Sequence, residues 1–295
     1  MGYILVTGCN GFIGSKLTQT LLNRGYKVLG ISYSKSCNIV GKNFKYISVN
    51  LNNCLTIEKI FRENNISKVI HLAAIAHVKK GQKVNWNSYY RVNTLASKTI
   101  FECSIKAEAK IFFASSIDVY GASKERKWTE DIAPIPVSLY GKSKYLAEQY
   151  LQDLYGDKGN YTIGRFAPVY SDKNKKDVYK RIYVKFPNFA MVLATKPYYT
   201  LLSIENLVNF IAKWVENNNI EKNIINICDK DSVSAEFLIN NEKKEGRAKY
   251  IIKIPYLISW FFSWVSNKLL YSHSKADLGF TLTKLFDPRE IPYKL

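Results

Sequence analysis

The sequence predicts an α/β fold built on a doubly wound parallel sheet, with a smaller and partly non-contiguous C-terminal region. Strand-like and helix-like segments alternate through the first half of the chain, a glycine-rich turn joins the first strand to the first helix, and the alternation weakens around Pro168. We therefore expect residues 1–167 to form the sheet domain, with residues 200–228 returning to it. Residues 168–199 and 229–295 are expected to form the second region.

The expected elements follow from the spacing of the apolar residues. The first strand is the apolar run of residues 3–7, and the first helix follows because Leu17, Leu21 and Leu22 recur at helical spacing until Gly25 ends it. The further strands are expected at residues 27–32, 44–49, 68–72, 110–114, 161–166 and 224–228. The further helices are expected at residues 55–61, 85–106, 138–154 and 203–216. Helices placed between successive strands favour parallel pairing.

Length and composition fit an ordinary globular protein, because the 295 residues are 47% hydrophobic and 23% charged. The five cysteines are scattered without the spacing of a zinc or redox motif, and three histidines add little, so we expect no metal site. The N-terminal sequence lacks the pattern of a secretory signal. We therefore expect a cytoplasmic protein with reduced thiols.

The chain is strongly basic, with a formal net charge of +19. A basic surface attracts polyanions and steers anionic small molecules, but no nucleic-acid-binding motif accompanies the charge, and we expect no nucleic-acid partner. The apolar residues 251–270, interrupted by Lys253 and Lys268, are the one candidate for membrane contact. We expect there a helix whose aromatic residues, Trp260 and Trp264 among them, pack into the core. Weak peripheral contact with a membrane is the alternative.

Three glycines, Gly8, Gly11 and Gly14, lie in the turn between the first strand and the first helix. In a dinucleotide-binding turn the first glycine permits the tight bend, the second lets the backbone approach a pyrophosphate, and the third lets helix and strand pack closely. The amides and the positive dipole end at the helix start bind the phosphates. This turn predicts a Rossmann-type nicotinamide dinucleotide site with contacts from Gly8, Asn10, Gly11, Phe12 and Ile13.

The choice between NAD and NADP is expected to depend on the end of the second strand. An acidic residue that binds the ribose hydroxyls of NAD is expected there, but the sequence has Ser32, followed by Lys35. No carboxylate would repel the additional phosphate of NADP, and a lysine is near. NADP is therefore slightly favoured, and NAD stays open.

Tyr140 and Lys144 lie four residues apart in an expected helix, so they share one face. A phenol with a pKa of ~10 is a poor acid–base group at neutral pH. A neighbouring ammonium favours the phenolate, which lowers that pKa. We expect Tyr140 to exchange a proton with a substrate hydroxyl while Lys144 also binds the nicotinamide ribose. Ser116, with Ser115 as the weaker candidate, is expected to donate to the substrate oxygen from the end of the fifth strand.

These motifs resemble those of the NAD-dependent epimerase/dehydratase family of extended short-chain dehydrogenases, which includes the UDP-glucose 4-epimerases. The resemblance runs over nearly the whole chain and also rests on His71-Leu72-Ala73-Ala74 and on residues 165–170. It implies that the C-terminal region binds substrate. It also implies further cofactor contacts from Asn50, Leu51, Leu72, Ala73, Ala74, Asn93, Ala167 and Val169, besides those of Tyr140 and Lys144.

The resemblance implies hydride transfer at C4 of a UDP-linked or dTDP-linked sugar, in surface polysaccharide biosynthesis. An epimerase would return the hydride to the other face of the sugar, whereas an NADPH-dependent reductase would reduce a 4-keto sugar. Ser32 favours the reductase, and the general likeness favours the epimerase. The resemblance disfavours dehydration, because Ile117 lies where the dehydratases have an acidic residue.

The sequence also suggests where the substrate diphosphate binds and which other class of protein is possible. The substrate diphosphate is expected near basic residues of the second region, and the candidates are Lys180, Arg181, Lys185 and Arg289. A homodimer is left open. The alternative of another class is a catalytically inactive NAD(P)-binding regulatory or scaffold protein, which the intact Ser116, Tyr140 and Lys144 disfavour.

Overall fold

A computed structural model describes most of the chain: residues 2–76, 84–156, 160–172, 174–183, 189–217, 223–272 and 274–293, apart from the side chains of Lys176, Asp177 and Lys180. Its contacts divide the chain into two compact units. The first comprises Met1–Val119, Leu139–Arg165 and Leu207–Ile225, and the second comprises Tyr120–Ser138, Phe166–Asn206 and Asn226–Leu295. Tyr120–Ser138 thus belongs to the second unit, although the sequence pattern had grouped it with the sheet. In the described ranges, no helix is long and apolar enough to cross a membrane.

Seven strands form one sheet in the order β3-β2-β1-β4-β5-β6-β11. They are β1 (Tyr3–Thr7), β2 (Val28–Ser32), β3 (Phe44–Ser48), β4 (Ile66–His71), β5 (Lys110–Ser116), β6 (Tyr161–Phe166) and β11 (Ile224–Ile227). The pairs β1–β2, β1–β4, β2–β3 and β4–β5 are parallel. The strand order reverses between β1 and β4, and in doubly wound sheets ligands bind at the carboxyl ends beside such a reversal. The predicted doubly wound α/β sheet is confirmed.

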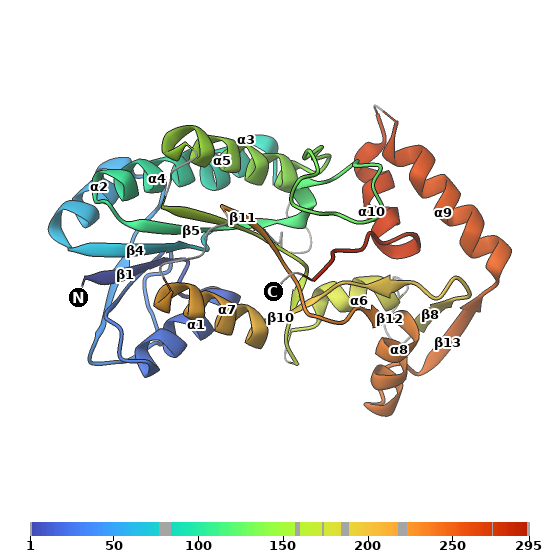
Figure 1. Cartoon of the computed structure of the whole chain (residues 1–295). Helices are drawn as coiled ribbons and strands as arrows, with labels where there is room; N and C mark the ends of the chain where they lie inside the picture. The colour runs from blue at the N-terminus through green and yellow to red at the C-terminus, as the bar shows by residue number, and fades with distance from the viewer. Residues whose placement is uncertain are drawn as a thin grey trace. The chain divides into compact units, whose positions relative to one another are not determined.

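Helices cover both faces of this sheet, which explains why its central strands are apolar along their whole length. Figure 1 shows α1 and α7 on one face and α2, α4 and α5 on the other. The helices are α1 (Phe12–Asn23), α2 (Cys54–Glu63), α3 (Trp86–Tyr89), α4 (Ala96–Lys106), α5 (Leu139–Tyr155) and α7 (Ile204–Glu216). Leu5 and Leu29, neighbours in β1 and β2, are fully buried in the core beneath α2, α4 and α5.

The long helix expected at residues 85–106 is divided into three parts. A π-helical segment, η1 (Tyr90–Leu95), separates α3 from α4, and a short 3₁₀ turn, η2 (Ile117–Val119), follows β5. Asn93 and Thr94 are buried in η1. π-Helical turns are rare and occur mostly at functional sites. Here the wider turn presents two polar side chains to the interior of the first unit.

The second unit is built from short elements around a small core that includes Ile182, Tyr199 and Ile239. Its strands pair two by two: β7 (Val169–Tyr170) with β10 (Leu202–Ser203), β8 (Phe189–Leu193) with β13 (Tyr250–Ile254), and β9 (Tyr198–Tyr199) with β12 (Val233–Ser234). Its helices are α6 (Lys176–Ile182), α8 (Ala235–Lys244), α9 (Tyr256–Leu270) and α10 (Ala276–Phe286).

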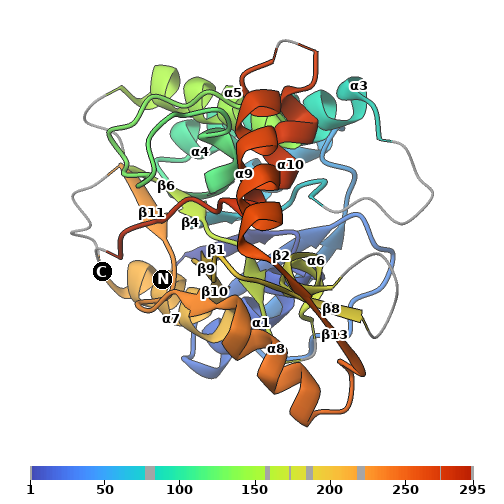
Figure 2. The same ribbon diagram turned by 90° about the vertical axis from the view of Figure 1, so that its right-hand side faces the viewer.

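The apolar residues 251–270 do not form one buried helix. They divide between β13 and α9, and α9 lies beside α10 (Figure 2). The expectation that its aromatic residues pack into the core is wrong, because Trp260 is 53% and Trp264 44% exposed. The face of α9 that is buried bears Ser259, Ser266 and Leu270 instead, and at the end of this face a Cβ on Gly279 of α10 would lie 2.0 Å from the Leu270 nitrogen.

Candidate active site

The glycine turn after β1 has the geometry expected of a phosphate-binding turn. Gly8 has a φ of +70°, and a Cβ on Gly14 would lie 2.1 Å from the Gly8 oxygen, so only glycine fits at position 14. Gly11 is the N-cap of α1 and provides no side-chain hydrogen bond, and no acidic residue lies in the first turn. The backbone amides at the start of α1 and the positive end of its dipole are therefore available to bind an anionic group. Phe12 and Ile13 open this helix.

The turns after β1 and β4 lie against each other at the carboxyl edge of the sheet. The Ala73 amide donates a 3.1 Å hydrogen bond to Thr7 Oγ1. A Cβ on Gly8 would lie 3.0 Å from the backbone of Ala73. Leu72 and Ala74, which flank Ala73, are half-buried. The structure therefore brings together the cofactor residues predicted at the point where the strand order reverses.

At the end of β2, Tyr46 joins two predicted cofactor residues. The Ser32 hydroxyl lies 3.0 Å from the Tyr46 hydroxyl and accepts a 3.2 Å hydrogen bond from the Ser34 amide. Asn10 Nδ2 donates to the same Tyr46 hydroxyl at 3.2 Å. Lys35 is exposed. Sequence reasoning missed Tyr46, because it lies in the neighbouring strand and no spacing rule connects it with Ser32.

The turn after β3 contains two predicted residues of different character. Asn50 is exposed, and its Oδ1 accepts a 3.1 Å hydrogen bond from the Asn52 amide. Leu51 packs against the core of the first unit. Asn50 thus shapes the turn, and its contact with the adenine stays a prediction.

His71, at the end of β4, is fully buried between two hydroxyl groups. Its Nδ1 lies 2.6 Å from Thr7 Oγ1, and its Nε2 lies 2.8 Å from Ser97 Oγ. Burial, with a smaller contribution from the charge of Lys144, lowers the pKa of His71 to about 3. His71 is therefore neutral at physiological pH and fixes β1, β4 and α4 relative to one another.

Asn93 connects the loop after β4 with the helix α5. Its Oδ1 accepts a 2.8 Å hydrogen bond from the Ile75 amide, and its Nδ2 donates to the Ile75 oxygen at 3.0 Å. The second proton of Nδ2 is donated to Ser143 Oγ at 3.0 Å. Because both amide protons are used within the protein and the side chain is fully buried, the structure gives Asn93 a positioning role.

Tyr140 and Lys144 lie one turn apart on α5. Tyr140 is half-buried, and its ring meets that of Tyr89 edge to face at 6.4 Å. Lys144 is 1% exposed, and its ammonium lies 4.0 Å from the centre of the Phe113 ring. Burial lowers the pKa of Lys144 to about 7, although the nearby Glu148 carboxylate raises it. A lysine with this pKa changes charge within the physiological range.

The two serines at the end of β5 differ in what surrounds them. The Ser115 hydroxyl is buried and donates to Glu148, whose carboxylate is paired at 2.7 Å with the buried Arg165. Ser116 is half-buried, and its hydroxyl accepts a 3.2 Å hydrogen bond from the Asp118 amide. The Ser116 hydroxyl is therefore better placed than the Ser115 hydroxyl to donate a hydrogen bond to a substrate oxygen. Glu148 was missed, although its place four residues after Lys144 is a usable signal.

Two predicted cofactor residues, Ala167 and Val169, belong to the second unit. Ala167 is buried, and its amide donates a 2.9 Å hydrogen bond to the Ile227 oxygen. Val169 lies opposite Leu202 in the β7–β10 pair. Their contact with a cofactor stays a prediction.

The basic residues suggested for the substrate diphosphate have different surroundings in the second unit. The Arg289 side chain is 7% exposed and pairs with Asp287 at 3.1 Å. The Arg181 guanidinium lies 5.7 Å from the centre of the Tyr199 ring. Lys185 and the side chain of Lys180 lie outside the described residues.

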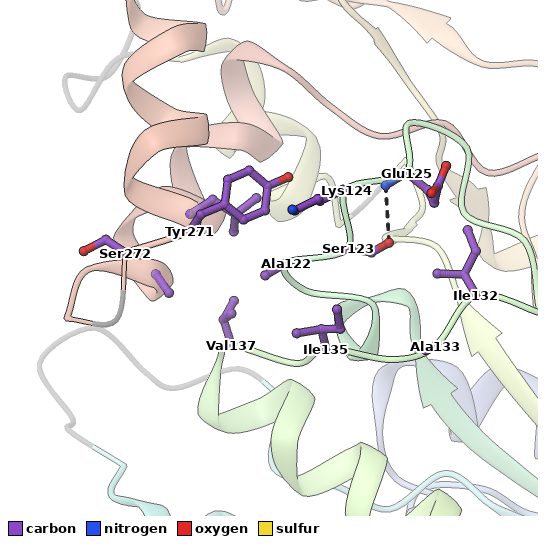
Figure 3. A pocket seen from close by; sticks show the side chains of 12 residues that line it. Ala122, Ser123, Lys124, Glu125, Ile132, Ala133, Ile135, Val137, Tyr271 and Ser272 are labelled. Atoms are coloured by element: carbon purple, nitrogen blue, oxygen red, sulfur yellow. Dashed lines mark hydrogen bonds between the residues drawn. The ribbon is translucent and has the colours of Figure 1, made fainter.

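The second unit also contains a cavity of about 670 Å³. One wall is the loop that follows β5, including Lys124, Ile135 and Val137, and the other is the turn between α9 and α10 (Figure 3). The ammonium of Lys124 lies 5.9 Å from the centre of the Tyr271 ring. None of the residues predicted from the sequence is among the described residues of its lining.

The parallel sheet with helices on both faces and the glycine turn after β1 give this chain a Rossmann-like fold. The chain belongs to the NAD dependent epimerase/dehydratase family, whose model matches residues 4–228.

Individual relatives agree with this assignment. The UDP-glucose 4-epimerase of Caenorhabditis elegans is 35% identical over 173 residues, which are 52% of this chain and 49% of that protein. The chain spans about half the length of the curated relatives it matches.

Solved structures share the fold. The UDP-Glc/GlcNAc 4-epimerase of Campylobacter jejuni has a TM-score of 0.73 at 18% identity, covering 87% of each chain. The UDP-glucose 4-epimerase of Thermus thermophilus in complex with NAD has a TM-score of 0.66 at 24% identity, covering 86% of each chain.

Proposed function

We propose that the protein is a sugar-nucleotide epimerase that transfers hydride at C4 of a UDP-linked sugar in surface polysaccharide biosynthesis. The observation that carries this proposal is that Tyr140 and Lys144 lie one turn apart on α5, with Lys144 buried and its ammonium 4.0 Å from the centre of the Phe113 ring. The family membership and the resemblance of half the chain to UDP-glucose 4-epimerases support it.

The residues present fit a nicotinamide dinucleotide. The turn at Gly8 and Gly14 has no room for side chains, and the start of α1 offers uncapped amides to a pyrophosphate. When bound, the nicotinamide supplies a carbon that accepts hydride and returns it. Ser32, hydrogen-bonded to Tyr46, would meet the adenosine ribose. Because Ser32 is no carboxylate, NADP is favoured slightly over NAD.

The proton is moved by the chain's own residues. Tyr140 would remove the proton of the C4 hydroxyl as hydride leaves the same carbon, and Ser116 would donate a hydrogen bond to that oxygen. The Lys144 ammonium, one turn along α5, would favour the phenolate form of Tyr140. Glu148 keeps part of the positive charge on Lys144 despite the burial.

A second candidate is an NADPH-dependent reductase of a 4-keto sugar nucleotide, and the observation that favours it is Ser32 at the end of β2. The catalytic residues would have the same roles. Tyr140 would then deliver a proton to the 4-keto oxygen, and no hydride would return to the cofactor.

The cavity in the second unit is proposed to receive the sugar nucleotide. Lys124 is part of its lining and would offer a cation to the diphosphate. Replacing Lys124 by alanine should raise KM for the sugar nucleotide without lowering kcat comparably, because Lys124 would bind ground state and transition state alike.

The test is a turnover assay of the purified chain. UDP-glucose and UDP-galactose are supplied with NAD or NADP, and 4-keto sugar nucleotides with NADPH. We expect interconversion of the two UDP sugars, and a loss of ~10²–10⁴-fold in kcat for Tyr140→Phe. Tyr145→Phe, on the same helix, is the matched control and should keep its activity. Oxidation of NADPH without interconversion would establish the reductase instead. Cofactor binding without turnover of any substrate would mean a scaffold protein.

A further inference from the structure

The helix α9 has its polar and apolar faces inverted with respect to the protein. Ser259, Ser266 and Leu270 are buried against the rest of the second unit, whereas Leu257 is 77% and Phe261 50% exposed. An amphipathic helix of a globular protein normally turns its apolar stripe to the core. In α9 the large apolar side chains face outward.

The two serines on the buried face of α9 can be buried because the hydroxyl of each donates to a nearby backbone oxygen. Ser259 Oγ donates to the Pro255 oxygen at 3.0 Å, and Ser266 Oγ donates to the Ser263 oxygen at 2.7 Å. Gly279, which has no side chain, lets α10 approach the backbone of α9 closely at Leu269 and Leu270. The packing of α9 is therefore complete on one side and leaves the opposite side unpartnered among the described residues.

The outward face is a continuous stripe. Leu257, Trp260, Phe261 and Trp264 recur at the spacing of one helix face, about 180° away from the serines at 100° per residue. Lys268 continues the stripe at the C-terminal end of α9, and its ammonium lies 4.2 Å from the centre of the Trp264 ring. We call these five residues the outer stripe.

The exposed charges on α9 and on the segment before it are positive, although Asp287 accepts a hydrogen bond from Asn267 of α9. The sequence contains no Asp or Glu between Glu245 and Asp277, whereas Lys249, Lys253 and Lys268 are exposed in this stretch. The whole chain has a formal net charge of +19. A second copy of the chain placed on the outer stripe would bring the same charge, so the complementary surface is an anionic one.

We propose that the outer stripe of α9 docks the protein onto an anionic membrane surface. Tryptophan and other aromatic rings concentrate at the headgroup level of membranes, and lysines beside them meet lipid phosphates. The 15 residues of α9 extend over about 22 Å, less than the ~30 Å of the hydrocarbon layer, so the helix would lie along the surface. This inference does not rest on the proposed enzymatic function.

The test uses the full chain with lipid vesicles at physiological ionic strength. Sedimentation with vesicles of phosphatidylcholine and phosphatidylglycerol in equal parts is compared with phosphatidylcholine alone. We expect binding to the anionic vesicles. Leu257→Gln with Phe261→Gln should weaken that binding about tenfold or more, because two apolar side chains no longer enter the interface. Lys268→Glu should weaken it too, and more so at low salt.

The matched control is Val40→Gln with Leu55→Gln, which changes two apolar side chains that are 83% and 78% exposed in the first unit. This variant should bind like the wild type, and both double variants should unfold at the wild-type temperature. Tryptophan fluorescence adds a direct reading: brominated lipid should quench the wild type, and Trp260→Phe with Trp264→Phe should remove most of that quenching.

Three results would overturn the inference. The first is wild-type protein that stays in the supernatant with anionic vesicles. The second is a stripe variant that binds them as well as the wild type does. The third is self-association of the wild type that the stripe variant loses, without vesicle binding, because the stripe would then contact a second copy.

Discussion

The side-chain amide of Asn93 donates a 3.0 Å hydrogen bond to the Ser143 hydroxyl and so joins the π-helical segment η1 to the helix that bears Tyr140 and Lys144. The same side chain is bonded in both directions to Ile75, after β4. One buried residue therefore positions the helix of the proposed catalytic pair against the loop beside the glycine turn.

Replacing Asn93 by alanine should disturb both stability and activity. The Ile75 amide and oxygen lose their partner, and the Ser143 hydroxyl loses one donor while it keeps its bond to the Tyr140 oxygen, at a cost of about 2–4 kcal/mol in the free energy of unfolding. A shift of α5 should lower kcat by ~10–100-fold with little change in KM. Urea unfolding and steady-state kinetics measure the two effects. Asn87→Ala, at an exposed position, is the control, and equal behaviour of the two variants would remove the positioning role.

The low pKa of Lys144 predicts a pH dependence of stability. The pKa of Lys144 is about 7 in the folded protein, whereas the ordinary value of 10.5 applies to the unfolded chain. Between these values the unfolded chain binds a proton that the folded protein does not, so the free energy of unfolding rises with pH. Lys144→Met should remove this rise, as urea unfolding at about pH 7 and about pH 10 would show. Lys142→Met, on the exposed side of α5, should leave it unchanged.

The low pKa of His71 predicts that the stability of the protein depends on pH in the acid range. Its pKa of about 3 lies below the ordinary value of 6.5. As the pH falls from 6.5 towards 3, His71 takes up a proton in the unfolded chain but not in the folded protein, so the free energy of unfolding falls. His71→Gln should lower stability at neutral pH and lose less of it upon acidification. Thermal unfolding temperatures across this range test the point, and parallel curves for the two proteins would refute it.

Gly14 should tolerate no side chain. Its Cβ would lie 2.1 Å from a backbone oxygen of the same turn, whereas a Cβ on Gly41 would meet only side-chain atoms of Leu22, the nearest at 3.2 Å. We expect Gly14→Ala to raise the dissociation constant for NAD by about tenfold or more, or to prevent folding, because backbone must move. Gly41→Ala should bind as the wild type does. Calorimetric titration with NAD separates the outcomes, and normal NAD binding by Gly14→Ala would contradict the tight turn.

The sheet could be predicted because its strands are short apolar runs between helices. The expected bounds agree with β1 (Tyr3–Thr7) and β6 (Tyr161–Phe166), and the parallel order follows from the crossover helices. The glycine turn and the Tyr140–Lys144 spacing were visible because each depends on local geometry. Such features need no knowledge of tertiary packing.

Other features depend on contacts distant in sequence and could not be read from spacing. The π-helical segment η1 keeps a nearly helical pattern, so apolar periodicity does not reveal it. The hydrogen bond between Ser32 and Tyr46 joins two strands, and that between Ser115 and Glu148 joins a strand to a helix. The close approach of α9 to Gly279 joins two helices, and the apolar residues of α9 alone do not reveal which of its faces is buried.

The most direct test of the central claim is a single-turnover experiment with UDP-glucose deuterated at C4 and the NAD-loaded protein. We predict transient formation of reduced nicotinamide and UDP-galactose that keeps its deuterium, both lost in Tyr140→Phe and retained in Tyr145→Phe. If the wild type binds NAD and UDP-glucose but forms neither, or if Tyr140→Phe equals the wild type, then Tyr140 and Lys144 do not perform this chemistry.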